Sequence, residues 1–370
     1  MAERAPRRTA RNPDYFLLAV IFLLVVFGLA MLASASSDIG KTLFNDTYYY
    51  LKHQIFYGLS LGILGFLVAY FVPFYHWKKY AFIFLLIGIF TLVAVFTPLG
   101  TYMGGSSRWL KLGPLSFQPA ELMKLVFIMY LAAWLSNTKF KRSTDFQSGL
   151  VPFILVAALV GALLILQPAT STVAILLGAG LTVYFVSGAP YKYIIGTILL
   201  GVAVVALVVY VTPYRRARIL GYLDPGADTQ GQNYQVNQAL IAIGSGGLAG
   251  VGYGQSATKA SYLPDPIDDS IFAITGEELG FVGASILATL FAIVCLRMFW
   301  LAKRMGDQFG RLLLVGFGMV VALQAFVNMA SISGLIPLTG VPLPFVSYGG
   351  TALAIFLTMM GISVNVTKYR

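Results

Sequence analysis

The sequence predicts an all-α membrane protein, a polytopic bundle of about ten transmembrane spans with both termini in the cytoplasm. Hydrophobic residues make up 58% of its 370 residues and charged residues only 11%, whereas about a quarter of the residues in a soluble domain are charged. The apolar residues form long unbroken runs, and a membrane-spanning helix needs about 20 of them. This composition excludes a water-soluble globular enzyme and a disordered chain, and the run lengths argue against a β-barrel.

Ten apolar runs are the predicted spans. They lie near residues 15–36, 53–72, 80–97, 118–136, 149–166, 171–188, 192–211, 271–300, 311–333 and 349–366. Lys and Arg favour cytoplasmic loops, and a cytoplasmic N-terminus places 16 of the 25 Lys and Arg residues on that side. Residues 1–14 then form a basic cytoplasmic tail and residues 15–370 a single transmembrane domain. Orientation and anionic membrane lipids account for the basic clusters, so we expect no nucleic-acid partner.

Three outer segments are candidates for function: residues 98–117, 212–270 and 334–348. The segment 212–270 is the longest loop of the chain, and loops of this length are usually functional or disordered. It is rich in glycine and aromatic residues and carries both charge signs, so we expect an ordered, partly re-entrant extracytoplasmic loop between spans 7 and 8. With one cysteine and two histidines in the chain, a disulfide or a Cys- or His-based metal cluster is not expected.

Basic residues flank the first two outer segments. Arg108, Lys111 and Lys124 are candidates for a cationic wall that binds an anionic headgroup. Glu121 lies three residues before Lys124, so the two can also form a structural ion pair on one helix face. Arg215, Arg216 and Arg218 suit phosphate or pyrophosphate, although snorkelling to lipid headgroups explains them equally well. Farther along the loop, Gln238 and Ser245 are candidate substrate contacts.

Five carboxylates crowd the outer start of the span at 271–300: Asp265, Asp268, Asp269, Glu277 and Glu278. Helix capping is one explanation, and Asp268 suits it. Repulsion among the carboxylates would also raise at least one pKa, as a general base requires. In the last outer segment, prolines and glycines around Ser347 exclude a regular helix. Such backbone at membrane depth either forms a tight connector or lines a cavity.

Four stretches carry a resemblance to a known family: RWLKLG with FQPAELMK at 108–124, AIGSGGL at 242–248, LPDPIDD with EELG at 263–280, and PLPFVSYGG at 342–350. In this order they resemble the SEDS family (shape, elongation, division and sporulation) of FtsW- and RodA-type proteins. The resemblance covers residues 14–365. It is nearer to the division type than to the elongation type, because of residues 75–80 and the spacing of residues around Tyr234.

The resemblance implies a peptidoglycan glycosyltransferase that polymerises lipid II at the outer face of the bacterial cytoplasmic membrane. It implies Asp269 as the general base and undecaprenyl pyrophosphate as the leaving group, with Lys52, Ser347 and the basic residues above near the substrate. It also implies a class B penicillin-binding protein and other divisome or elongasome membrane proteins as partners. No cofactor is certain, although clustered carboxylates and pyrophosphate suit Mg²⁺ or Mn²⁺.

Two departures from the family pattern bear on the site. The family's acidic residue after QP is Ala169 here, and its arginine before the glutamine at position 54 is His53. Ala169 leaves open a non-catalytic scaffold that activates its penicillin-binding partner. A lipid II flippase or transporter is the other alternative, because charged residues within spans would suit it and several spans contain glycine.

Overall fold

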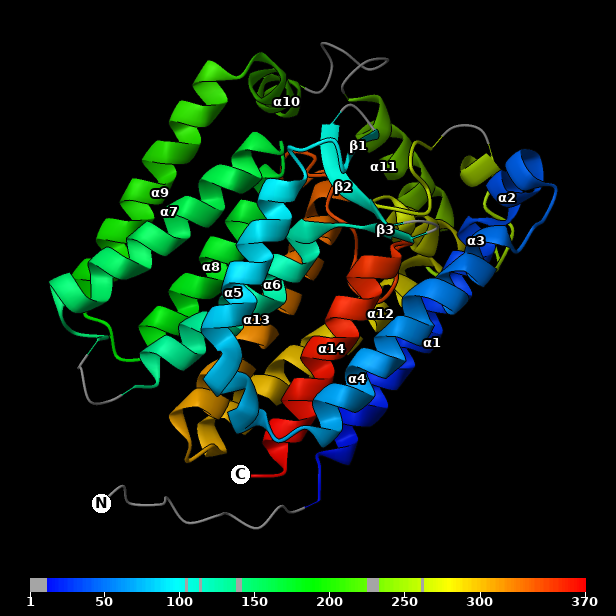
Figure 1. Cartoon of the computed structure of the whole chain (residues 1–370). Coiled ribbons are helices and arrows are strands. Elements are labelled where there is room, and N and C mark those ends of the chain that lie inside the picture. Colours follow the sequence, from blue (N-terminus) through cyan, green and yellow to red (C-terminus); the bar gives the residue numbers. More distant parts are fainter. Residues whose placement is uncertain (1–11, 104–105, 113–114, 138–141, 225–232, 261–262) are drawn as a thin grey trace.

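The computed structural model describes residues 12–103, 106–112, 115–137, 142–224, 233–260 and 263–370. It is a helical bundle, and a helix lies at each of the ten predicted spans (Figure 1). Eight of these helical stretches are long and apolar enough to cross a membrane, and α8 is a shorter apolar helix. The all-α polytopic prediction is confirmed, while the count of ten crossings and the cytoplasmic placement of the termini stay predictions.

The first half of the chain contributes α1 (Tyr15–Ala35), the short α2 (Ser37–Phe44), and a continuous stretch of α3 (Tyr49–His53), η1 (Gln54–Leu59) and α4 (Ser60–Phe71). The next helices are α5 (Phe74–Ala94), α6 (Pro119–Leu135), η3 (Phe146–Leu150) with α7 (Val151–Leu166), α8 (Thr170–Val186) and α9 (Tyr191–Val211). Proline precedes or opens several of these helices, because its fixed φ and missing N–H suit a first turn.

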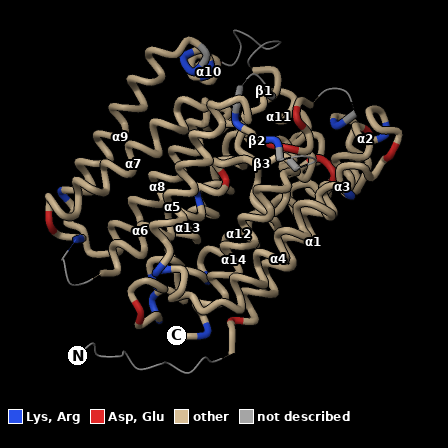
Figure 2. The backbone as a smooth tube through the Cα atoms, in the orientation of Figure 1, with Lys and Arg blue, Asp and Glu red and all other residues tan. Residues whose placement is uncertain are grey.

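The second half contributes α10 (Pro213–Leu223), α11 (Tyr234–Gly246), the short η4 (Thr258–Ala260), α12 (Ile271–Arg304), α13 (Gln308–Ile332) and α14 (Gly350–Thr367). The described part of the loop 212–270 is therefore ordered. Many residues of α6 and α13 are buried, whereas α9 has no buried residue. Charged residues gather at the two ends of the bundle and are sparse along its length (Figure 2).

The structure adds a small sheet that the apolar pattern does not predict. Strands β1 (Gly100–Met103), β2 (Ser106–Leu112) and β3 (Leu115–Phe117) pair antiparallel in that order. Leu110 of β2 is buried against Ala94 and Val95 at the end of α5. The sheet therefore folds back over this end of the bundle.

Both ends of the described chain lie together. Asp14 is buried and accepts hydrogen bonds from Arg370, at 2.7 Å, and from Arg297 of α12, at 2.8 Å. An even number of crossings requires the two ends to lie on one side. The predicted basic tail, residues 1–14, lies outside the described residues except for its last three.

One long helix is interrupted. Within α12, Gly280 has φ 65° and ψ −166°, which breaks the helix into a short outer part and a long inner part. The loop after α11 replaces the lost backbone hydrogen bonds: Phe281 and Val282 donate to Gly247 and Leu248, at 2.9 and 3.2 Å. Glycine is needed here because a Cβ at position 280 would lie 2.3 Å from the nitrogen of Gly250.

Candidate active site

The predicted site motifs meet at one irregular segment, residues 333–349, which joins α13 to α14. Its backbone carbonyls accept hydrogen bonds from three different elements: Leu338 from Arg218 of α10, Val341 from Asn328 of α13, and Thr339 from Ser171 of α8. Pro342 and Pro344 lie within it, and proline cannot continue a helix. The prediction of irregular backbone before the last span is confirmed, and several helices hold this backbone in place.

Asp269 lies beside this segment, two residues before α12. Its side chain is only 9% exposed, and its Oδ1 accepts a hydrogen bond of 2.9 Å from Gln235 of α11. Its backbone carbonyl accepts a second one of 2.9 Å from Asn328. A Cβ built on Gly340 would lie 3.7 Å from the other carboxylate oxygen, Oδ2. Two helices thus position the carboxylate against the irregular segment.

Burial and the negative charge of Asp265 raise the pKa of Asp269 to about 6, although the hydrogen bond from Gln235 and the charge of Arg218 oppose the shift. Desolvation disfavours the ionised form of any buried carboxyl group. A carboxylate with this pKa is mostly ionised at pH 7, yet it binds a proton more strongly than an ordinary aspartate. Asp269 therefore has the property that a general base needs.

The neighbouring Asp268 also has a raised pKa, of about 7, because its surroundings desolvate it and because Asp269 and Asp265 are negatively charged. The pKa alone therefore does not distinguish the two aspartates. The hydrogen bond from Gln235 to the carboxylate of Asp269 does, and Asp269 is also the less accessible of the two residues.

The expectation that Asp268 caps α12 is wrong. The N-cap residue of this helix is Ser270, which makes no side-chain capping bond. The backbone carbonyl of Asp268 instead accepts a hydrogen bond from the buried hydroxyl of Ser347. Ser347 also accepts one of 2.8 Å from the nitrogen of Leu343, so it ties the irregular segment to the Asp269 loop.

Glu121 and Lys124 form a buried ion pair, with 2.6 Å between Oε1 and Nζ. Lys124 also donates a 2.6 Å hydrogen bond to Gln324 of α13, whose amide donates to the carbonyl of Pro342 at 2.9 Å. The side chain of Lys124 is 1% exposed. This geometry favours the structural alternative, in which the pair supports the irregular segment from within the bundle.

The predicted arginines divide into two groups. Arg108 donates to the carbonyls of Gln167 and Pro168, at 3.0 and 2.9 Å, and Arg215 donates to Ile165, at 3.2 Å. These carbonyls end α7, where backbone acceptors lack helical partners and a positive charge is favourable. Arg218 is half-buried and close enough to Asp269 to lower its pKa. Of the four predicted arginines, Arg218 is therefore the best placed to act with Asp269.

The other five candidates make no hydrogen bond to the carboxylate among the described residues. Lys52 is exposed and pairs with Asp46 at 2.7 Å, while Lys111 of β2 and Arg216 of α10 are also exposed. The hydroxyl of Ser245 bonds to the carbonyl of Ala242 in its own helix, at 2.8 Å, and Gln238 is half-buried on α11. Within the described part of the chain, the side chain that bonds to the Asp269 carboxylate is Gln235 and none of these five. Their role at the substrate stays a prediction.

A small hollow lies between α10, α11 and the irregular segment. It measures about 100 Å³ and is lined by Arg218, Asn233 and Asn237, together with apolar residues including Leu338. Sites that enclose drug-sized ligands measure ~300–1,000 Å³. In this conformation the hollow has room for a phosphate-sized group and not for a disaccharide.

The described residues contain no group of three or more His, Cys, Asp or Glu side chains that could hold a metal ion. A divalent cation held by three or more such side chains therefore has no site in this part of the chain. A cation carried by pyrophosphate oxygens stays a prediction.

Three residues of the site are absent from the candidates predicted by sequence: Gln235, Gln324 and Asn328. Each is an amide whose partner lies on another element, so no local pattern marks the pair. An amide within an apolar run is itself a signal, because a polar group at membrane depth needs a hydrogen-bond partner. Both Gln324 and Asn328 lie within α13 and carry that signal.

Fold and site together define a multi-pass membrane protein with a buried, proton-binding carboxylate at one end of its helical bundle. Residues 14–370 match the family model of FtsW-, RodA- and SpoVE-type proteins described as "Cell cycle protein". The chain belongs to this family, whose members are multi-pass proteins of the bacterial cytoplasmic membrane. The predicted family and localisation are confirmed.

Known relatives cover nearly the whole chain. Stage V sporulation protein E of Bacillus subtilis (strain 168) is 36% identical over 359 residues, which cover 97% of this chain and 98% of the relative. A protein named probable peptidoglycan glycosyltransferase FtsW from Geobacter sp. (strain M18) is 36% identical over 361 residues, with coverage of 97% and 98%.

Two solved structures share the fold. One, described as "Structural coordination of polymerization and crosslinking by a peptidoglycan synthase complex", is 30% identical, covers 96% of this chain and 97% of its own, and has a TM-score of 0.79. The other is the rod shape determining protein RodA of Thermus thermophilus, 27% identical, with 96% coverage of both chains and a TM-score of 0.71.

Proposed function

We propose that this chain is a peptidoglycan glycosyltransferase that polymerises lipid II at the outer face of the cytoplasmic membrane. The observation that carries the proposal is the buried Asp269, with a pKa raised to about 6 and positioned by α11 and α13 at the end of the bundle. The names of the relatives and the family membership support the same class of reaction.

Asp269 would act as the general base. Its carboxylate takes the proton from a sugar hydroxyl of one lipid-linked disaccharide while that oxygen attacks the anomeric carbon of another. The bond from the anomeric carbon to the pyrophosphate oxygen breaks, and undecaprenyl pyrophosphate leaves with the bonding electrons. A single displacement needs one base, on the side of the attacking hydroxyl, and it inverts the anomeric centre.

The leaving pyrophosphate gains negative charge as the bond breaks, so a fixed cation beside it lowers the barrier. Arg218 lines the small hollow, and its charge lowers the pKa of Asp269. Arg108, Arg215 and Arg218 all donate to backbone carbonyls, and we assign Arg218 to the leaving group because it alone of the three lowers the pKa of Asp269 by its charge. The polyprenyl tail would lie along the apolar helices.

The proposal includes a class B penicillin-binding protein as the partner that cross-links the product, and association with other division or elongation proteins. The similar fold found in a peptidoglycan synthase complex supports this assembly.

Purified protein, reconstituted with its penicillin-binding partner and lipid II, tests the assignment. We expect glycan strands from the wild type and none from Asp269→Ala. Asp268→Asn is the matched control, because it removes a neighbouring carboxylate that is exposed, and we expect it to keep most of the activity.

Equal polymer from wild type and Asp269→Ala would refute the base assignment, and loss of polymer from Asp268→Asn alone would move it to Asp268. Transport of lipid II across a vesicle membrane without polymer would favour the flippase. A partner enzyme activated equally by Asp269→Ala, with no polymer from either protein, would favour the scaffold.

A further inference from the structure

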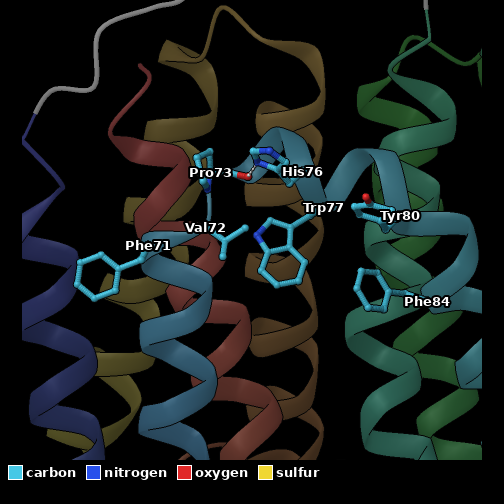
Figure 3. Close-up of a pocket in the computed structure, with 7 residues that line it drawn as sticks. All are labelled: Phe71, Val72, Pro73, His76, Trp77, Tyr80 and Phe84. Carbon is cyan, nitrogen blue, oxygen red and sulfur yellow. Dashed lines mark hydrogen bonds between the residues drawn. The ribbon is translucent and has the colours of Figure 1, made fainter.

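A second, larger hollow lies at the opposite end of the bundle from Asp269, where α4 ends and α5 begins (Figure 3). It measures about 490 Å³ and is lined by Phe71, Val72, Pro73, His76, Trp77, Tyr80 and Phe84. This end of the bundle also holds the described chain ends, because Phe74 donates a 2.9 Å hydrogen bond to Asn365 near the end of α14. Phe71 is 71% exposed and Tyr80 43% exposed, so the hollow opens to the surface that faces the bilayer.

Beside the hollow lies a buried hydrogen-bond donor that has no partner among the described residues. The indole nitrogen of Trp77 is buried, and no hydrogen-bond partner of it is found among the described residues. Figure 3 shows this nitrogen directed toward Val72, into the space between the two helices. A buried N–H without an acceptor is costly, and because neighbouring side chains cover this nitrogen, an acceptor brought by a ligand would stabilise it once those side chains shift.

Positive charge borders the hollow on two sides. Lys79 is exposed, and its Nζ lies 5.3 Å from the centre of the Tyr80 ring. On the other side, Lys368 donates to the carbonyl of Tyr70 at 2.9 Å, and its Nζ lies 6.0 Å from the centre of the Phe71 ring. None of the described residues that line the hollow is acidic. An apolar recess with a cationic rim matches an anionic amphiphile.

We propose that this hollow binds one anionic phospholipid of the membrane leaflet at this end of the bundle. An acyl chain occupies the apolar recess, an ester carbonyl accepts the hydrogen bond from Trp77, and the phosphate lies at the rim near Lys79. The proposal is independent of the glycosyltransferase assignment, because the site lies at the far end of the bundle from Asp269.

Native mass spectrometry of the full chain tests this site, with protein taken from bilayers that contain equal amounts of phosphatidylglycerol and phosphatidylcholine of the same acyl chains. We expect one retained phosphatidylglycerol. Lys79→Gln should lower its retention about fivefold, as expected for one lysine near a membrane surface. Trp77→Phe should lower it by a similar factor, about that of one hydrogen bond. Lys303→Gln, which removes an exposed charge at the end of α12, is the matched control and should not change it.

A second measurement uses phosphatidylglycerol brominated along its acyl chains, which quenches tryptophan fluorescence on contact. We expect strong quenching of the emission that is lost in Trp77→Phe. No such quenching, or equal retention of the two lipids, would overturn the proposal. An equal loss of phosphatidylglycerol retention with Lys303→Gln would also overturn it. Displacement of the lipid by undecaprenyl phosphate would overturn it too, and would assign the hollow to a polyprenyl chain. If Trp77→Phe does not fold, Lys79→Gln alone keeps the test decisive, because its side chain is exposed.

Discussion

Two buried carboxylates from the same acidic cluster, Glu278 and Asp269, differ in the number of hydrogen-bond donors around them. The difference distinguishes a carboxylate that stabilises the fold from one that can still accept a proton. Glu278 is fully buried and contacts several donors: the hydroxyl of Ser34, at 2.6 and 2.7 Å, and the ammonium group of Lys259, at 3.0 Å. Among the residues that the structure describes, Asp269 accepts one side-chain hydrogen bond, from Gln235, and the guanidinium group of Arg218 donates to the carbonyl of Leu338. Glu278 is therefore committed to the fold, whereas Asp269 keeps acceptor capacity for a substrate proton.

Glu277 belongs with Glu278 in this comparison. It accepts hydrogen bonds from the hydroxyls of Ser256 and Thr258 and from the nitrogen of Ala257, the last at 3.1 Å. Both glutamates fix the loop 246–259 against the outer part of α12. Clustering of acids in a sequence thus does not identify a base, and the number of donors around each carboxylate separates the two glutamates from Asp269.

The largest effect should come from Asp269→Asn. The amide keeps the size of the side chain but cannot take a proton at neutral pH, so we expect the rate of lipid II polymerisation to fall ~10²–10⁴-fold, the range for loss of a general base. The melting temperature should not fall, since the buried charge is removed. Single-turnover rates and a thermal unfolding curve on the same sample measure both.

Glu278→Leu should have the opposite effect, lowering stability and not the activity of the folded protein. It leaves the ammonium group of Lys259 buried without its counter-charge, which costs ~3–5 kcal/mol of stability. We expect a large drop in melting temperature, with activity lost only in proportion to the folded fraction. The double variant Lys259→Met/Glu278→Leu should recover most of the stability, and failure to do so would contradict the pairwise account.

The pH dependence of polymerisation should follow Asp269. Because the base must be ionised and its pKa is raised to about 6, we expect the rate to level off above pH 7 and to fall about tenfold per pH unit well below 6. Asp265→Asn removes a charge that raises this pKa, so its midpoint should move to lower pH. A midpoint that does not move would assign the profile to another group.

The stability of the folded state should change with pH in the opposite direction to the rate. The pKa of Asp269 is ~3.9 in the unfolded chain and about 6 in the folded one, so the folded state binds the proton more strongly. This residue's contribution to stability is therefore present at low pH and is lost as the pH rises from ~4 to ~6.

The smallest effect should come from Gln235→Ala. This amide donates to the ionised carboxylate and lowers its pKa, so its loss should raise the midpoint of the pH–rate profile. At pH 7 we expect only a few-fold slower polymerisation, in line with one hydrogen bond of ~1 kcal/mol. Gln238→Ala, three residues along α11, is the comparison and should leave the midpoint unchanged.

The helices could be read from the sequence because apolar runs as long as a bilayer leave the backbone few alternatives to a helix. The small sheet at 100–117 could not, since its strands are short and interrupted by glycine and proline. The position of Asp269 outside a long helix also followed from sequence, through the acids, the prolines and the family motifs around it.

The hydrogen bonds at the site could not be predicted from local pattern. Asn328 meets the carbonyl of Asp269 across 59 positions of chain, and Lys124 meets Gln324 across 200. The capping expectation for Asp268 failed because the chain turns at Asp265, whose carbonyl accepts from the nitrogens of Asp268 and Ser270. Ala169 stands at the turn whose neighbouring carbonyls Arg108 holds, an interaction that needs no acid at that position.

The break at Gly280 has a mechanical consequence. The part of α12 that follows Asp269 is the short outer part, Ile271–Leu279. This outer part packs against α11, which fixes its orientation. A change of tilt of the long inner part in a thicker or thinner bilayer therefore reaches the carboxylate through Gly280 and the hydrogen bonds to the loop after α11, and not through a continuous helix. The enzyme can vary its lipid-facing surface while its reaction geometry is preserved.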